Sequence, residues 1–201
     1  MNRQILITLA LGAVLAGCVT SQFNFVVKPL STEPGSNKIN LSAGLQLSPE
    51  LCTYNHTSVH QGGENHFQLG HSLCGYAKSV VRDSFASMTV AENGAFAAPV
   101  DVIIKPKVTN VTVFYRTGAI PAKVESVILM EWNITDRTGN ILYTNTVQGD
   151  GIDQRKYGMA DVRYQASMQN ALDDLFNKSY REILASPELR HVADKIRKGG
   201  P

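Results

Sequence analysis

Few features of this 201-residue sequence point to chemistry. The chain has three cysteines and one tryptophan, and it contains no nucleophile elbow, glycine-rich phosphate loop, HExxH motif or CxxC pair. Its carboxylates are scattered, with no spacing that singles out an acid and a base. We therefore predict that the protein is not an enzyme and that it uses no cofactor.

The sequence also lacks a strong charge of either sign. Lysine and arginine number 19 and aspartate and glutamate 17, which gives a formal net charge of +2. Binding to nucleic acid depends on a basic surface that releases counterions from the phosphates, so we expect no nucleic-acid partner. A content of 43% hydrophobic and 18% charged residues is typical of a folded globular domain.

Long apolar runs are missing except at the N-terminus. There, Arg3 precedes an apolar run from Ile5 to Ala16, and small residues follow it. This is the pattern of an export signal, and the run is shorter than the ~20 residues that a membrane-spanning helix needs. We therefore predict that residues 1–17 are a signal peptide that is removed.

The end of this segment, Leu15-Ala16-Gly17-Cys18, resembles a bacterial lipobox. The resemblance implies that Cys18 becomes an acylated N-terminus, and two or more acyl chains anchor a protein stably in a membrane. The alternative is an ordinary secretory signal that ends at a cysteine. In Gram-negative lipoproteins of this kind, Asp after the cysteine favours retention in the inner membrane. Val19 in that position therefore predicts an outer-membrane anchor and a domain that faces the periplasm.

The two remaining cysteines, Cys52 and Cys74, bracket four of the five histidines. An even number of cysteines in an oxidising compartment favours one disulfide, which would stabilise the fold by about 3 kcal/mol. The alternative is a zinc site, because thiolates and imidazoles at short spacings are zinc ligands. The candidate metal ligands are the four histidines of this segment, namely His56, His60, His66 and His71.

Residues 18–37 are predicted to form the lipidated N-terminus, a tether and an edge strand at Phe23–Val27, and residues 38–201 a single domain. Alternating apolar residues predict strands, and apolar residues at helical spacing predict helices. A glycine after a polar turn predicts a hairpin at 136–140, and a change of apolar parity predicts a bulge near 106–110. The expected strands are 39–47, 100–115, 122–134 and a strand from Ile141 that ends at Gly149 and Gly151; the expected helices begin at Ser72, near Met168 and after Ser186.

This order predicts an α+β fold. Its sheet is mostly antiparallel, two main helices pack on one face, and a short helix follows at the C-terminus. The cysteine segment is expected to be a loop, and the disulfide is expected to join a helix to the sheet. The second face of the sheet is either solvated or covered by something else.

Several segments resemble small Gram-negative outer-membrane lipoproteins of the YajG-like, lipopolysaccharide-assembly and ABC-transport auxiliary types. Besides LAGC, they are the helix LCGYAKSVVRDSF, the strand pair VESVILMEWNITDRTGNILYTNTVQGDG and the ending QASMQNALDDLFNKSYREILASPELRHVA. Together they cover roughly residues 72–193. The resemblance implies a non-catalytic domain, tethered to the membrane, that docks on another envelope protein or on a lipid.

The leading hypothesis is therefore an accessory or assembly factor of a cell-envelope transport or assembly complex. A second hypothesis is a carrier that binds lipid or lipopolysaccharide between the sheet and the helices. A third is a protein that binds metal through the histidine-rich segment.

Overall fold

The computed structural model describes residues 20–31, 38–60, 63–92, 94–116, 123–154 and 160–198. Within these ranges the chain forms strands and helices in an α+β arrangement, as the sequence predicts. The predicted signal peptide and Cys18 lie outside the described residues. None of the described helices combines the length and the apolar character that a membrane-spanning helix needs.

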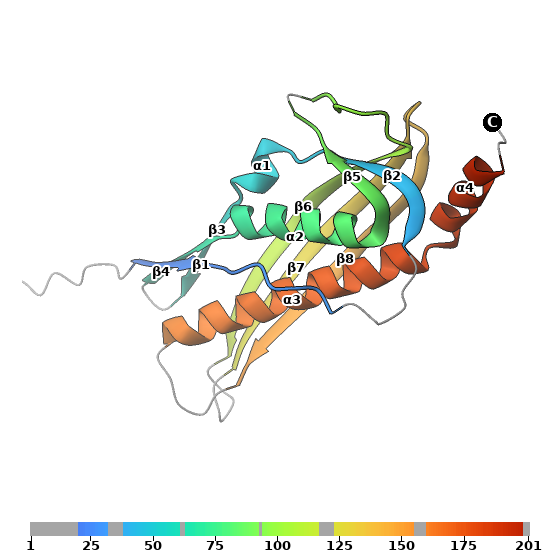
Figure 1. Ribbon diagram of the computed structural model, residues 1–201. Helices are drawn as coiled ribbons and strands as arrows, with labels where there is room; N and C mark the ends of the chain where they lie inside the picture. Colours follow the sequence, from blue (N-terminus) through green and yellow to red (C-terminus); the bar gives the residue numbers. More distant parts are fainter. Residues whose placement is uncertain are drawn as a thin grey trace, which may run out of the picture.

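The larger of two sheets has five strands. They are β2 (Ile39–Leu45), β5 (Phe85–Val90), β6 (Val102–Arg116), β7 (Lys123–Asp136) and β8 (Ile141–Asp153). Their order is β5-β2-β6-β7-β8, with β6, β7 and β8 antiparallel and β2 parallel to both of its neighbours (Figure 1). The predicted mostly antiparallel sheet is therefore confirmed, although its strands β5 and β2 join in parallel.

Two details of the strand prediction are also confirmed. The register between β6 and β7 shifts between Val108 and Asn110, within the range predicted for a bulge. The turn between β7 and β8 places Gly139 at a φ of 91°, a left-handed conformation that costs glycine little. Asp136 holds this turn by accepting hydrogen bonds from the backbone amides of Thr138 and Asn140.

The smaller sheet has three strands and contains most of the segment between the two cysteines. They are β1 (Thr20–Asn24), β3 (Asn55–His60) and β4 (Gly63–Gln68), in the order β1-β4-β3. The expectation of a loop in this segment was therefore wrong. The β3–β4 hairpin buries only one large apolar side chain, Phe67, so its hydrophobic alternation is too weak to predict strands.

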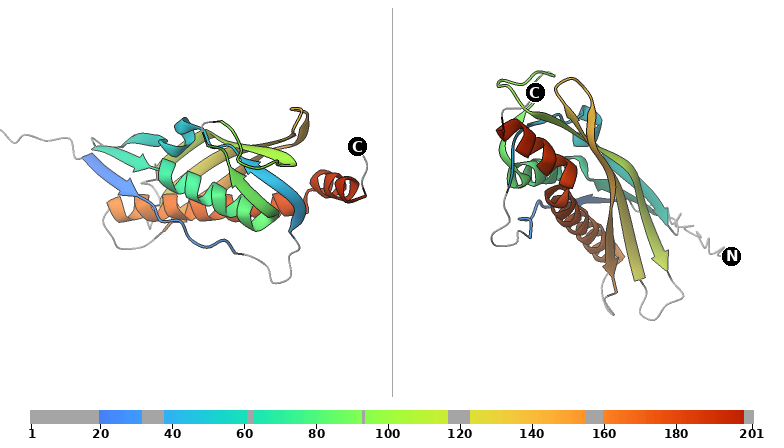
Figure 2. Two further views of the ribbon diagram at one scale, coloured as in Figure 1. Left: turned by 45° about the horizontal axis from the view of Figure 1, so that its top comes forward. Right: turned by 90° about the vertical axis from the view of Figure 1, so that its right-hand side faces the viewer.

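Two long helices, α2 (Gly70–Ser84) and α3 (Ala160–Ala185), cover one side of the five-stranded sheet (Figures 1 and 2). Two short helices, α1 (Pro49–Cys52) and α4 (Pro187–Arg197), complete the fold. The predicted start of α4 is confirmed, because Ser186 accepts a hydrogen bond from the amide of Leu189 at 3.3 Å. Two main helices on one face and a short C-terminal helix are thus as predicted.

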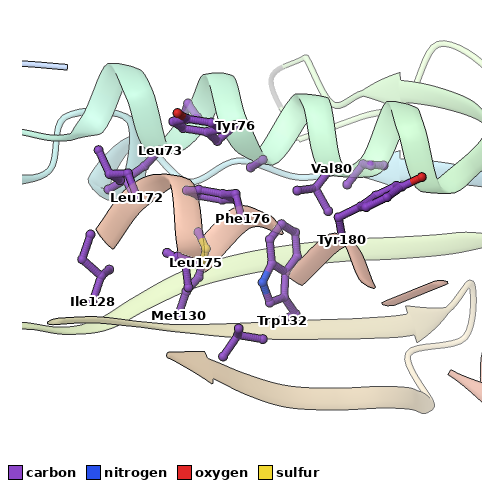
Figure 3. Close-up of a cluster of buried hydrophobic side chains, with 14 of the residues drawn as sticks. Leu73, Tyr76, Val80, Ile128, Met130, Trp132, Leu172, Leu175, Phe176 and Tyr180 are labelled. Atoms are coloured by element: carbon purple, nitrogen blue, oxygen red, sulfur yellow. The ribbon is translucent and has the colours of Figure 1, made fainter. Parts of the chain in front are cut away.

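The core fills the layer between these helices and the sheet (Figure 3). The ring of Tyr76 on α2 stacks on Phe176 of α3, with 4.8 Å between centroids. The only tryptophan, Trp132, is fully buried and donates a hydrogen bond from Nε1 to Ser179 Oγ at 2.9 Å. Further buried side chains in this layer are Leu73, Val80, Ile128, Met130, Leu172 and Leu175.

Two glycines expected to end β8 instead lie inside it. Gly149 and Gly151 face α3, where a Cβ on Gly149 would overlap the carbonyl oxygen of Ala171 and a Cβ on Gly151 that of Ser167. The glycines therefore permit a close approach of helix and strand, and β8 continues to Asp153.

The start of α2 also differs from the prediction. The helix begins at Gly70, and Ser72 is not its N-cap; the Ser72 hydroxyl donates to the carbonyl of Phe25 at 2.7 Å. At the other end, Phe85 and Met88 continue the helical spacing of apolar residues but belong to β5. The periodicity therefore runs past the end of the helix because both residues still face buried apolar surroundings.

The edge strand predicted at Phe23–Val27 is β1, but it lies earlier in the chain, at Thr20–Asn24, and residues 25–27 are not part of it. After β1 the chain runs in extended form across α2 and α3, and we call residues 25–31 the N-terminal strap. Gln169 of α3 bonds both the amide and the carbonyl of Val26, at 3.1 and 3.0 Å, and Asn177 accepts from the amide of Ser31 at 2.7 Å. This part of the predicted tether is therefore bonded to the domain.

Candidate docking surface

The side of the five-stranded sheet opposite α2 and α3 is uncovered over β7 and β8 in the described part of the chain (Figure 2). We call this side the open face. Along β7, residues that point to the open face alternate with residues that point to the core, because successive side chains of a strand point to opposite faces. The β7 residues of the open face are Lys123, Glu125, Val127, Leu129, Glu131, Asn133 and Thr135.

One cross-strand row at the end of the open face combines apolar and charged groups. Phe114 of β6 pairs with Glu125 of β7, which pairs with Ile152 of β8. Phe114 and Ile152 are 47% and 46% exposed. The carboxylate of Glu125 contacts Lys123 and lies 3.1 Å from Arg116 Nε; the hydrogen bond from Lys123 and the nearby positive charges lower the pKa of Glu125. The row thus offers two exposed apolar side chains beside a fixed charge cluster.

A cavity of about 870 Å³ lies toward the other end of the open face. Its floor is formed by outward-facing side chains of β6 and β7, and its wall by the segment that leaves β2, by α1 and by the chain after β5. The floor comprises Lys105, Lys107, Glu131 and Asn133, and the wall includes Leu47, Pro49, Leu51, Tyr54 and Ala91.

The cavity combines an apolar wall with a floor that carries positive, negative and uncharged polar side chains. Lys107 pairs across the strands with Glu131, and Lys105 with Asn133. The Oδ1 atom of Asn133 is buried and has no hydrogen-bond partner among the described residues. An unpaired buried acceptor is costly, so a donor from a bound group would stabilise it. Burial also raises the pKa of Tyr54 in the wall. The cavity is therefore suited to an inserted polar or charged group with an apolar stem.

The disulfide between Cys52 and Cys74 holds the wall of this cavity in place. It joins α1 to α2, with 5.4 Å between the Cα atoms, and not a helix to the sheet as expected. Gly70 supports the same junction, since a Cβ at this position would overlap the carbonyl oxygen of Cys52. A helix of four residues is not stable alone, so α1 depends on these contacts for its position.

The four histidines make different contacts. His60 stacks on Tyr164 with 5.6 Å between centroids, and His66 accepts or donates a bond with Thr57 Oγ1 at 3.0 Å. Burial, together with the charge of His60, lowers the pKa of His56. His71 is exposed on α2.

No three His, Cys, Asp or Glu side chains within the described ranges are grouped so that they could hold a metal ion. The two cysteines are joined to each other and are therefore not available as thiolate ligands. The zinc site stays a prediction, and the described residues contain no group of side chains placed to form it.

The wall of the cavity was missed from the sequence, although a signal for it exists. Ser48-Pro49-Glu50 repeats the Ser-Pro-Glu start that predicts α4. The structure uses both in the same way, because Ser48 accepts a hydrogen bond from the amide of Leu51 at 3.2 Å. The floor residues Glu131 and Asn133 lie on the side of β7 that faces away from the core.

No protein-family profile matches the chain, and no curated protein matches it by sequence. Solved structures do match in fold. A DUF330 protein from Xanthomonas campestris aligns with a TM-score of 0.56 at 9% identity, over 90% of this chain and 99% of that chain. The predicted resemblance is therefore confirmed at the level of the fold.

Two further structures align with lower scores. A minor lipoprotein from Acinetobacter baumannii has a TM-score of 0.43 at 16% identity, over 74% of this chain and 94% of its own. Lipoprotein B from Nitrosomonas europaea has a TM-score of 0.43 at 10% identity, over 85% and 94%.

Proposed function

We propose that the protein is a non-enzymatic lipoprotein, anchored in the outer membrane through Cys18 and facing the periplasm. It serves as an accessory or assembly factor of a cell-envelope transport or assembly complex. The open face is the site where it binds a partner protein of that complex.

The observation that carries this proposal is the open face itself. Within the described residues, β7 and β8 are covered on one side only. Phe114 and Ile152 are exposed there beside the charges around Glu125, which is the mixture of apolar and polar groups found at protein interfaces. The cavity toward the other end of this face provides a place for one anchoring side chain, and such anchors carry much of the binding energy at interfaces.

Recovery of partners from detergent-solubilised envelopes tests the docking site. We expect the native protein to recover an envelope protein in a defined ratio, and the double variant F114E/I152E to recover little of it, because two buried charges would oppose binding. The matched control is V26E, since Val26 is 69% exposed on the N-terminal strap, over the helices. Equal recovery by all three proteins contradicts docking on the open face, and recovery of no partner in mild detergent contradicts the accessory role.

The anchor is tested separately. Cys18→Ala removes the atom that would carry the acyl chain, and we expect the protein to move from membrane to soluble fractions. Separation of inner and outer membranes on a sucrose gradient then shows which of the two membranes holds the native protein. Retention of the alanine variant in the membrane contradicts anchoring through Cys18.

A second candidate function, as a lipid carrier, is favoured by the cavity on the open face. The layer between sheet and helices is filled by buried side chains, so a lipid has no room there among the described residues. A lipid would instead bind with its chain against Leu47 and Leu51 and its head near Lys105. Native mass spectrometry of the protein purified from membranes checks this, and an adduct lost on Leu47→Glu supports it.

A further inference from the structure

The β3–β4 hairpin lies directly beside the start of β1. Thr20, the first residue of β1, pairs with Glu64 of β4, and Glu64 pairs with Val59 of β3. These three residues form one row across the smaller sheet, next to the end of the hairpin. Figure 1 shows β1, β3 and β4 together at the left end of the domain.

Very little chain separates this row from the proposed anchor. Cys18 is two residues before Thr20, and two extended residues span at most ~7 Å. Neighbouring strands lie about 4.8 Å apart, which puts Val59 about 10 Å from Thr20. Acyl chains on Cys18 would therefore hold the row close to the membrane surface.

β1 and the residues that follow it are packed against the domain. Phe23 and Phe25 are 5% and 7% exposed, and Phe23 stacks on Phe67 of β4 with 5.1 Å between centroids. The N-terminal strap that follows is bonded to α2 and α3 through Ser72 and Gln169. An anchor at Cys18 would therefore join this domain through two residues and not through a long tether, which would limit how far the domain can turn about it.

We infer that the end of the smaller sheet that carries Val59 is the membrane-facing end of the domain and lies among the lipid headgroups. The inference rests on the proposed anchor at Cys18. Val59 suits this position because it is 66% exposed and apolar, and apolar side chains gain free energy at the boundary of the acyl layer. The turn between β7 and β8 lies at the opposite end of the domain (Figures 1 and 2), so this orientation would point it away from the membrane.

Tryptophan fluorescence in vesicles tests the orientation. Lipidated V59W is reconstituted into phosphatidylethanolamine and phosphatidylglycerol vesicles that carry a nitroxide quencher on a fraction of the headgroups. The matched control is I141W, because Ile141 is 65% exposed at the far end of the domain. Native protein supplies the background from Trp132, which is fully buried. We expect the quencher to reduce the added fluorescence of V59W and to leave that of I141W unchanged.

A spacer variant tests the orientation of the domain separately from its anchoring. Insertion of a flexible Gly-Ser segment between Val19 and Thr20 should leave the protein bound to vesicles but abolish the quenching of V59W. Flotation with the vesicles reports the anchor independently. Protein that floats with equal quenching at both positions overturns the orientation and leaves the anchor intact, whereas protein that does not float overturns both. Matching urea midpoints of the variants establish that each one is folded.

Discussion

Lys28 of the N-terminal strap reaches Asp173 of α3, with Nζ 2.5 Å from Oδ2. The other oxygen of Asp173 accepts a hydrogen bond from the hydroxyl of Tyr76. That hydroxyl in turn accepts a hydrogen bond from the backbone amide of Lys28 at 3.0 Å. Burial is the largest cause that raises the pKa of Tyr76, and the hydrogen bond to Asp173 is the second. The phenol therefore remains a donor at neutral pH. Asp173 thus fixes the strap to both long helices.

Asp173→Ala should loosen the strap without unfolding the domain. The ion pair is partly exposed and contributes little by itself, while loss of the acceptor for Tyr76 should cost about 1 to 2 kcal/mol. We expect the amides of Val26 and Lys28 to exchange with deuterium faster than in the native protein. Asp83→Ala, which removes a surface pair with Arg82, is the control. Unchanged exchange in the strap would contradict this role of Asp173.

Gly151→Ala should destabilise the fold by about 3 kcal/mol. The new Cβ would overlap the backbone of α3 at Ser167, so helix and strand must separate, and strain of this kind in a packed core is costly. Urea unfolding measures the loss. Thr146→Ala, at an exposed site on the same strand, should change the free energy of unfolding by less than about 0.5 kcal/mol. A native-like midpoint for the Gly151 variant would mean that the helix can shift at little cost.

The elements predicted correctly are those whose sequence signal is local and repeated. Ile39, Leu41, Ala43 and Leu45 alternate along β2 and are all buried, and the apolar stripe of α3 faces the sheet. The turn at Gly139 is likewise set by nearby side chains. In each case the pattern of the segment agrees with its place in the fold.

The elements that were missed depend on distant parts of the chain. Nothing near Gly149 or Gly151 shows that α3 packs against them, so the glycines read as a strand end. The β3–β4 hairpin is mostly polar because its strands bury few large apolar groups, and pairing with β1 completes its sheet. The cavity combines α1, β6 and β7, and a pattern within any one segment cannot show how these three meet.

The turn around Asp136 should make stability depend on pH in the acid range. Hydrogen bonds from Thr138 and Asn140 lower the pKa of Asp136 from 3.8 to about 2. A carboxylate with a lowered pKa in the folded state stabilises the fold above its unfolded pKa, and this contribution is lost as the pH falls through the folded value. The stability gap between native protein and Asp136→Asn should therefore be full above about pH 4 and shrink toward pH 2.

Unfolding in urea at a series of pH values between 6 and 2 measures this gap. Thr138→Ala removes one of the hydrogen bonds to the carboxylate, so it should raise the pKa of Asp136 and move the loss of stability to higher pH. A gap that stays constant down to pH 2 would show that the turn does not depend on the charge of Asp136.

The disulfide should stabilise both the fold and the wall of the cavity. Cys52 and Cys74 are separated by 22 positions, and cross-links that close loops of this length contribute about 3 kcal/mol, mainly by constraining the unfolded chain. The double variant C52S/C74S should lose about this amount in urea unfolding. Without the cross-link, α1 should also become mobile, so the amides of Leu51 and Cys52, or its serine replacement, should exchange faster.

Reductant provides the matched control for this prediction. It should lower the stability of the native protein to that of the serine variant and leave the serine variant unchanged. Before reduction, the mature protein should show no reactive thiol, because Cys52 and Cys74 are bonded to each other. Thiols that react without reductant would contradict the disulfide in the native protein, and would return the two cysteines to the set of possible metal ligands beside the histidines of β3 and β4.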